Sequence, residues 1–185
     1  MKEYGGRELA NAFRTVRGNS IKTAEDIPEE KYGFAASEGT RTVGQLLAHI
    51  AYISRISEDM HRTKRITGFH GYNFPAVAGG VAEAEAKLSG KAQIIAAMKS
   101  EGETFTAWLE SLSDEFLAER VENFDKSGNR SRLEMLLSPK EHEMHHRGQL
   151  MMLQRMVGVV PHLTRERQAR TAAAAAASPA APVKA

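Results

Sequence analysis

The stretch EHEMHHRGQL, residues 141–150, contains side chains that can bind a metal ion and move a proton. His142 and His146 stand four residues apart, so on a helix their imidazoles lie on one face, one turn apart. With Glu143 they form a His-Glu-x-x-His pattern, in which two histidines bind zinc and the glutamate acts as the base of a metalloprotease. Glu143 is therefore the candidate catalytic residue. The candidates for orienting the metal ligands or a bound water are Glu143, Glu141 and Gln149.

His49 is the third candidate metal ligand, because it stands in the middle of an apolar helix face between Leu46 and Ile53. Burying an imidazole without partners is costly, and a lone core histidine usually bonds to a backbone carbonyl. Here a second inward pair of histidines also needs partners, and one ion bound by all three would satisfy both. Helical bundles build such sites from side chains on facing helices. The predicted metal ligands are therefore His49, His142 and His146.

The other four histidines have simpler interpretations. His145 is displaced around its helix from the predicted pair. His61 and His162 lie near predicted helix ends, where a surface position is expected. His70 lies in a glycine-rich segment and is expected to be solvated.

The sequence disfavours a metalloprotease, although the His-Glu-x-x-His pattern is present. Such an enzyme needs a third ligand downstream of the pair, and one subgroup continues with His-x-x-Gly-x-x-His. After His146 the sequence RGQLMM has its glycine at a different position and contains no histidine. The one downstream glutamate, Glu166, lies beyond Pro161 at the start of a charged tail. The chain also has no convincing strand on which a peptide substrate would align.

Four long amphipathic helices must position these histidines. The spacing of the apolar residues predicts them over residues 7–26, 42–60, 90–112 and 138–156. Thr42 and Gln45 match a capping box for the second helix. The fourth begins either at a Ser138 cap followed by Pro139 or as a continuous, kinked helix from about Ser131. The predicted fold is an all-α four-helix bundle with a metal site between its second and fourth helices.

The remaining segments are predicted to connect or extend this bundle. Residues 67–80 are rich in glycine and are expected to form a connection, and residues 113–129 a short helical turn and a polar loop. Residues 1–163 are therefore expected to form one bundle domain. Residues 164–185 are an alanine-rich, low-complexity tail, predicted to be disordered or loosely helical and to lie outside the core.

Composition narrows the classes of function. The 185 residues suffice for one domain with a hydrophobic core, and the absence of cysteine excludes disulfides and thiolate ligands. The net charge of +2 comes from the tail and leaves a nearly neutral body, so we expect no nucleic-acid partner. Neither a signal peptide nor a membrane span is apparent, and a cytoplasmic protein without a membrane partner is expected.

Three stretches of the sequence resemble the DinB/YfiT-like family of helical-bundle metalloenzymes. They are IPEEKYGFAASEGTRTVGQLLAHI, WLESLSDEF and EHEMHHRGQLMMLQRMVGVVPHL. By this resemblance, the family's histidine on the second helix falls on His49, and its pair on the last helix falls on His142 and His146. The resemblance implies an up-down-down-up bundle that binds a divalent metal such as nickel, zinc or iron, often as a homodimer.

The same resemblance implies a metal-dependent enzyme that acts on a small-molecule substrate. The expected reaction is a thiol-dependent S-transfer or isomerisation, which uses an external low-molecular-weight thiol, or a hydrolysis. The alternatives are a non-catalytic metal-binding, stress-related dimer and, less favoured, a zincin-type metalloprotease. Three neutral imidazoles leave coordination positions for water or substrate, as is typical of a catalytic site. Ligation by imidazole alone does not select among zinc, nickel, copper and iron.

Overall fold

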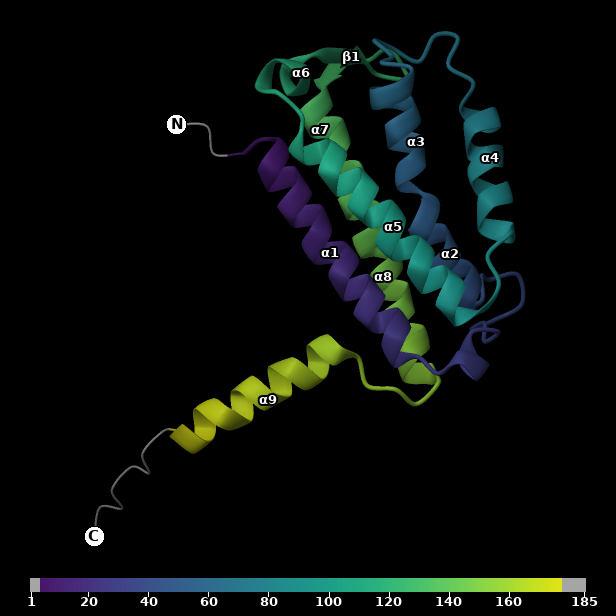
Figure 1. Cartoon of the computed structure of the whole chain (residues 1–185), viewed down its shortest axis with the longest axis vertical. Coiled ribbons are helices and arrows are strands. Elements are labelled where there is room, and N and C mark those ends of the chain that lie inside the picture. Colours follow the sequence, from purple (N-terminus) through teal and green to yellow (C-terminus); the bar gives the residue numbers. More distant parts are fainter. Residues whose placement is uncertain (1–3, 178–185) are drawn as a thin grey trace.

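The computed structural model describes residues 4–177, which form a four-helix bundle with further helices packed beside it and projecting from it (Figure 1). The long elements are α1 (Gly6–Asp26), α2 (Val43–Tyr52) with α3 (Ser54–Glu58), α5 (Gly90–Glu110) and α8 (Ser138–Met156). Figure 1 shows that α1 and α8 run in one direction and that α2–α3 and α5 run in the other. This arrangement is the predicted up-down-down-up bundle.

Local sequence sets the start of α2, and packing against α5 constrains the start of α1. In the predicted capping box, the backbone N–H of Gln45 donates to Thr42 Oγ1 (3.2 Å), and the N–H of Thr42 donates to Gln45 Oε1 (2.9 Å). Gly6 lets α1 approach α5 closely, because a Cβ at this position would lie 2.5 Å from the carbonyl oxygen of Leu109. Glycine is therefore needed there for packing, although it is a poor helix former.

The second predicted helix is interrupted and ends in a wider turn. After α3 the chain forms the π-helical turn η2 (Asp59–Thr63), in which His61 is fully buried. Arg132, itself buried, donates a hydrogen bond to His61 Nδ1 (3.0 Å). Burial and the charge of Arg132 lower the pKa of His61 to about 4. The predicted surface position of His61 is wrong because Arg132 and the segment around Ile66, whose carbonyl Arg132 also contacts, fold over this end of the helix.

The predicted connection at residues 67–80 is partly helical, which corrects the sequence interpretation. Helix α4 (Phe74–Ala86) lies beside α2 and α3 and runs back down the bundle to the start of α5 (Figure 1). Asn73 caps it by accepting a hydrogen bond from the N–H of Ala76 (3.1 Å), and Pro75 occupies its first turn. Gly79 and Gly80 in the middle weaken the helical pattern and led to the wrong prediction.

The predicted turn and loop at residues 113–129 contain more regular structure than expected. Helix α6 (Asp114–Ala118) is followed by two antiparallel strands, β1 (Arg120–Glu122) and β2 (Asn129–Ser131), with Val121 opposite Arg130. The sequence predicted no strand, because three residues are too few to show an alternating pattern.

The fourth helix is the kinked alternative of the two that the sequence left open. Helix α7 (Arg132–Leu136) is capped by Ser131 and Glu134, and Leu137, which is also helical in conformation, leads directly into α8. Ser138 does not cap α8. The short turn η1 (Glu29–Lys31) completes the elements between α1 and α2.

The bundle core contains two apolar clusters joined by a buried arginine. One cluster lies around Leu47, Ile50 and Met98, and the other around Phe13 and Phe105. Arg17 of α1 connects them, because its guanidinium stacks near the ring of Phe13 and donates to the carbonyls of Met98 (2.9 Å) and Ile50 (2.8 Å).

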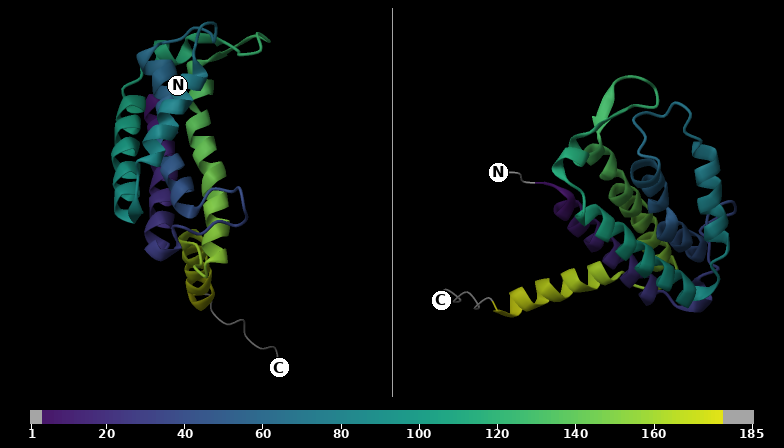
Figure 2. Two further views of the ribbon diagram at one scale, coloured as in Figure 1. Left: turned by 90° about the vertical axis from the view of Figure 1, so that its right-hand side faces the viewer. Right: turned by 45° about the horizontal axis from the view of Figure 1, so that its top comes forward.

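Helix α9 (His162–Ala177) leaves one end of the bundle and projects away from it (Figure 2). Its first turn is tied to α1, where Arg165 pairs with Asp26 (2.8 Å) and His162 contacts Asn19 (3.3 Å). His162 is buried by this packing, so its predicted surface position is wrong. Most of the tail lies outside the core, as predicted, and residues 178–185 fall outside the described part of the chain.

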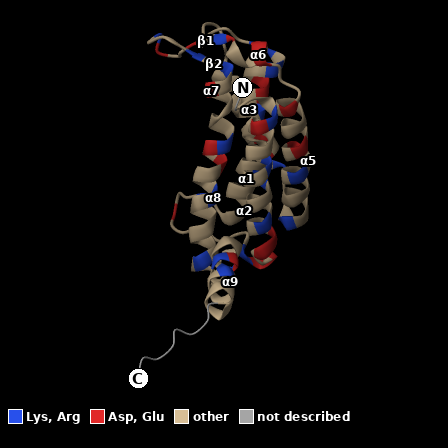
Figure 3. Ribbon diagram, turned by 90° about the vertical axis from the view of Figure 1, so that its left-hand side faces the viewer, with Lys and Arg blue, Asp and Glu red and all other residues tan. Residues whose placement is uncertain are grey.

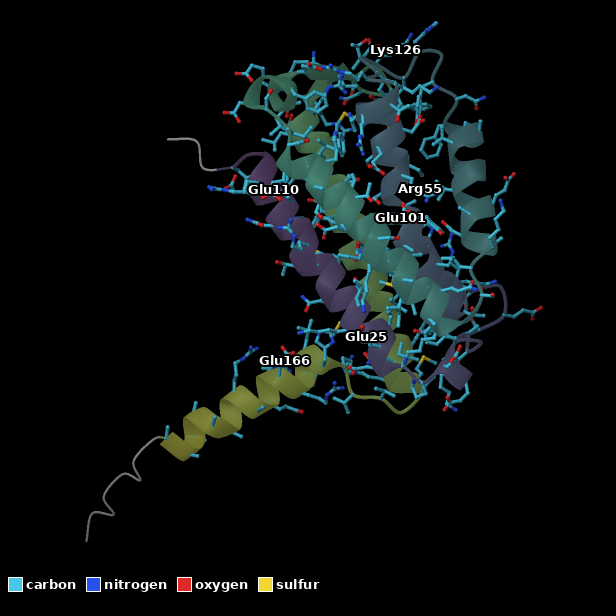
Figure 4. The ribbon with its side chains drawn as sticks, viewed as in Figure 1. Glu25, Arg55, Glu101, Glu110, Lys126 and Glu166 are labelled. Carbon is cyan, nitrogen blue, oxygen red and sulfur yellow. The ribbon has the colours of Figure 1, made fainter. Side chains whose placement is uncertain are left out.

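Charged residues of both signs are interspersed along the helices (Figure 3). Some link neighbouring elements, such as Arg55 of α3 and Glu101 of α5, whose closest N–O distance is 2.6 Å (Figure 4). Between residues 4 and 177, no helix has both the length and the apolar character required to cross a bilayer.

Candidate metal centre

The three predicted metal ligands meet where α2 packs against α8. His49 comes from α2, and His142 and His146 come from successive turns of α8. The Nε2 atom of His142 lies 3.1 Å from Nε2 of His49 and 2.9 Å from Nε2 of His146. One donor atom from each residue lies within 4.8 Å of the other two. The fold thus brings together the three side chains that the sequence singled out, from positions 93 residues apart.

Two neighbouring side chains orient these imidazoles from behind. His49 Nδ1 donates to a carboxylate oxygen of Glu85 on α4 (2.8 Å), because an ionised carboxylate can only accept. His146 Nδ1 donates to the amide oxygen of Gln149 (2.8 Å). With the proton held on Nδ1, the Nε2 atoms of both rings present lone pairs toward the common point. A carboxylate or amide behind a ligating imidazole is the usual outer partner of a metal-bound histidine.

The donor set fits a divalent transition metal. Glu85 and Gln149 hold the rings of His49 and His146 so that each presents an Nε2 lone pair to the common point. His142 Nε2 carries at most one hydrogen and can donate it to only one of these two lone pairs, so the other has no donor among the three rings. Burial, together with the neighbouring imidazoles, lowers the pKa of His142 to about 4, and burial also lowers the pKa of His146. These rings are therefore neutral near pH 7, the form that binds a metal. A divalent cation would satisfy all three nitrogens and leave coordination positions open.

The sequence matches the family model of the DinB superfamily over residues 12–150, a span that contains all three histidines. The chain belongs to the DinB superfamily. No match was found among curated proteins.

Two solved structures share the fold of this DinB-superfamily chain. A DinB-like protein of Bacillus subtilis, YjoA, is 19% identical with a TM-score of 0.59, and the match covers 82% of this chain and 92% of that one. YfiT, also from Bacillus subtilis, is 14% identical with a TM-score of 0.61, and the match covers 86% and 91% of the two chains. YfiT is described as a probable metal-dependent hydrolase with an unusual four-helix bundle topology.

Glu143, the candidate catalytic residue, lies in the bundle core and is paired with Arg17. Both of its carboxylate oxygens accept hydrogen bonds from Arg17 Nε, at 3.1 and 3.0 Å, and its side chain is 0% exposed. Burial raises the pKa of Glu143, while the Arg17 guanidinium lowers it. The carboxylate is thus held by a structural partner, and this geometry gives no support to a role as the base of a metalloprotease.

The other residues considered for the site differ in whether they contact the three imidazoles. Gln149 orients His146, as its sequence position suggested, and its amide nitrogen also contacts Nε2 of the exposed His145 (3.1 Å). Glu141 is exposed and has no hydrogen bond to the three imidazoles. His70 is exposed, as expected, and lines a different hollow at the opposite end of α4.

Glu85 is the residue of the candidate site that the sequence interpretation missed. It stands in the last turn of α4, which was expected to be a connection and its continuation rather than a helix packed on α2. The signal in the sequence was the stretch VAEAEA, whose alanines and glutamates favour a helix despite the two preceding glycines. Only the packing of α4 against α2 identifies which of the two glutamates faces His49.

Proposed function

We propose that this DinB-superfamily protein is a divalent-metal-dependent enzyme that acts on a small molecule, with hydrolysis as its favoured reaction. The proposal is carried by one observation: three imidazole nitrogens converge, and two of their rings are held in the metal-binding tautomer by Glu85 and Gln149. The likeness to YfiT, described as a probable metal-dependent hydrolase, supports the same class of reaction.

His49, His142 and His146 would hold the ion through their Nε2 atoms. A divalent metal with three imidazole ligands supplies a Lewis acid and lowers the pKa of a water bound to it. The residues of this chain contribute orientation and access. Glu85 and Gln149 fix the planes of two ligand rings, and a hollow beside Glu85 is large enough for a small substrate.

Proton transfer in this proposal does not use Glu143, because its carboxylate is paired with Arg17 inside the core. Within the described chain, Glu85 is the carboxylate that contacts a metal-ligand ring and also borders the hollow. Its second oxygen is free of the bond to His49, so this residue is positioned to accept a proton near the site.

A thiol-dependent transfer is the second reaction that the site accommodates. The chain contains no cysteine, so the thiol would be an external low-molecular-weight compound. The same ion would bind it as the thiolate, the form in which sulfur ligates metals and attacks electrophiles. A non-catalytic metal-binding protein would have the same site, and only an activity assay distinguishes it from an enzyme of either kind.

Metal analysis of histidine variants tests the proposal. We expect His49→Ala, His142→Ala and His146→Ala each to lose most of the bound metal, because every ring supplies one of three donors. His145→Ala is the matched control on the same helix and should keep its metal. A His49→Ala variant that binds metal like the wild type would refute the three-histidine site.

Activity assays then separate the reactions. The metal-loaded protein is screened with ester and amide substrates and, in parallel, with low-molecular-weight thiols plus electrophiles. We expect turnover that disappears in His142→Ala and survives in His145→Ala. Metal binding without turnover across both panels would favour a non-catalytic metal-binding protein.

A further inference from the structure

A hollow of about 440 Å³ lies next to the metal centre, between the start of α2 and the end of α4. It shares Glu85 with the centre, because one oxygen of this carboxylate accepts the hydrogen bond from His49. Ala48, the residue before His49, also lines it. A molecule bound in the hollow is therefore separated from a ligand ring by a single side chain.

Arg41 is the cation of this hollow, and its guanidinium has no hydrogen bond or ion pair within residues 4–177. Most other arginines of the bundle have a partner, as Arg55 has in Glu101 and Arg65 in Glu119. Arg147 of α8 also has a buried Nε without a hydrogen-bond partner, but it does not line this hollow. Arg41 is also close to the site through the hollow itself, because the lining includes Glu85, whose carboxylate accepts the hydrogen bond from His49. The guanidinium is thus available to a ligand that approaches the metal centre.

The backbone that carries Arg41 is held in place by the start of α2. Thr42, the next residue, is the cap of this helix, and its bonds with Gln45 fix the chain at this point. Gln45 also lines the hollow. Its amide oxygen is used by the cap, so its amide nitrogen is left as a second donor for a bound group.

The charges of the hollow select for an anion once a metal is present. Arg41 contributes one positive charge and a divalent ion two, whereas Glu85 contributes one negative charge that already faces His49. The net positive charge attracts an anion. A guanidinium can form two parallel hydrogen bonds with a carboxylate or with a phosphate. One guanidinium and one amide donor are enough for the two oxygens of a carboxylate, whereas the three terminal oxygens of a phosphate monoester accept more hydrogen bonds than these two groups donate.

We propose that Arg41 binds a carboxylate group of the substrate in this hollow, so that the enzyme acts on small molecules that carry a carboxylate. This inference rests on the proposed metal-dependent function, because the reacting group of the same molecule must reach the three histidines. Arg41 then selects the substrate and positions it, and it takes no part in holding the metal, which is the role of the three histidines with Glu85 and Gln149.

Hydroxamates are probes that test metal binding at the three histidines separately from carboxylate binding at Arg41. Acetohydroxamate binds a metal but has no carboxylate. A series of hydroxamates with a terminal carboxylate on two to five methylene groups adds the anion at increasing distances, and each is matched by a neutral primary amide of the same length. Dissociation constants are measured by calorimetry with the zinc-loaded protein at low ionic strength.

We expect that, at one chain length, the hydroxamate with a terminal carboxylate binds at least about ten-fold more tightly than the amide of the same length, as a hydrogen-bonded charge pair should. Arg41→Gln should reduce this preference to less than about two-fold, and Arg41→Lys should retain part of it. Both variants should bind acetohydroxamate as the wild type does. Arg167→Gln, which removes the same charge from exposed α9, is the matched control and should keep the full preference.

Three results overturn the inference. One is that no chain length favours the carboxylate in the wild type, and another is that the preference survives in Arg41→Gln. Either leaves the metal centre standing, because acetohydroxamate still binds. The third is that acetohydroxamate itself fails to bind the metal-loaded protein, and then the proposed function fails together with the inference.

Discussion

Replacing Glu143 with leucine removes the partner of a guanidinium that all four long elements of the bundle enclose. Arg17 of α1 donates to Glu143 of α8, to the carbonyl of Met98 in α5 and to that of Ile50 in α2. The side chains of Arg17 and Glu143 are 4% and 0% exposed. The substitution therefore leaves a charge in the core with two carbonyl acceptors and no counter-ion.

Removing one partner of a buried ion pair typically costs about 3–5 kcal/mol. Because the two carbonyls still accept from Arg17, we expect Glu143→Leu to lie near the lower limit, at about 3 kcal/mol. Arg17→Met should cost at least as much, since it leaves a carboxylate that is fully buried. The double variant Arg17→Met/Glu143→Leu has no stranded charge and should be more stable than either single variant.

Urea denaturation followed by circular dichroism measures these free energies of unfolding for the metal-free proteins. A double-mutant cycle should give a coupling of about 2 kcal/mol or more between the two residues. Single effects that simply add, with a coupling below about 0.5 kcal/mol, would refute the structural role of the pair. Glu143→Gln adds a test of catalysis: if Glu143 is structural, each folded, metal-loaded molecule should keep its turnover within about ten-fold.

Three further predictions follow from single contacts. Glu85→Ala should weaken zinc binding about 10- to 100-fold in a chelator competition, and unchanged affinity would mean that the carboxylate behind His49 is dispensable. Gly6→Ala should lower the free energy of unfolding in urea by about 2 kcal/mol, because the clash of the new Cβ exceeds the gain in helix propensity of about 1 kcal/mol; a stabilised variant would contradict this packing. The metal-free protein should lose stability as the pH falls from about 6.5 to about 4. In this window the unfolded chain takes up protons at His61 and His142 that the folded state, in which the pKa of each is about 4, does not bind. His61→Gln, which can still accept from Arg132, should remove on the order of 3 kcal/mol of that loss, and an unchanged pH profile would exclude His61 as its source.

The three candidate metal ligands were identifiable because each has a local signal. His142 and His146 repeat at the period of one helical turn, and His49 interrupts an apolar stripe where an imidazole needs a partner. The starts of α2 after Thr42 and of α7 after Ser131 follow from capping residues that lie three positions apart. These features depend on a few neighbouring residues, so the sequence alone specifies them.

The partners of the site depend on packing between distant segments and were not predictable in the same way. Helix α4 has two adjacent glycines and buries little apolar surface, so its pattern did not distinguish it from a loop. Glu85 gains its role only when this helix packs on α2. Similarly, His61 was assigned to the surface because nothing near it in the sequence indicates that Arg132 covers it.

Arg17 did leave a signal in the sequence, and it explains how the fold holds the metal centre together. On the first helix it falls on the same face as Phe13 and Ser20, an inward position where an arginine requires an acidic partner. On α2 and α8 it donates to Ile50 and Glu143, the residues that directly follow the candidate ligands His49 and His142. The buried guanidinium therefore fixes the separation of the two ligand-bearing helices one residue away from the imidazoles. The polar residue that the zinc-protease pattern assigns to catalysis serves here to hold the helices at the spacing that the three nitrogens require.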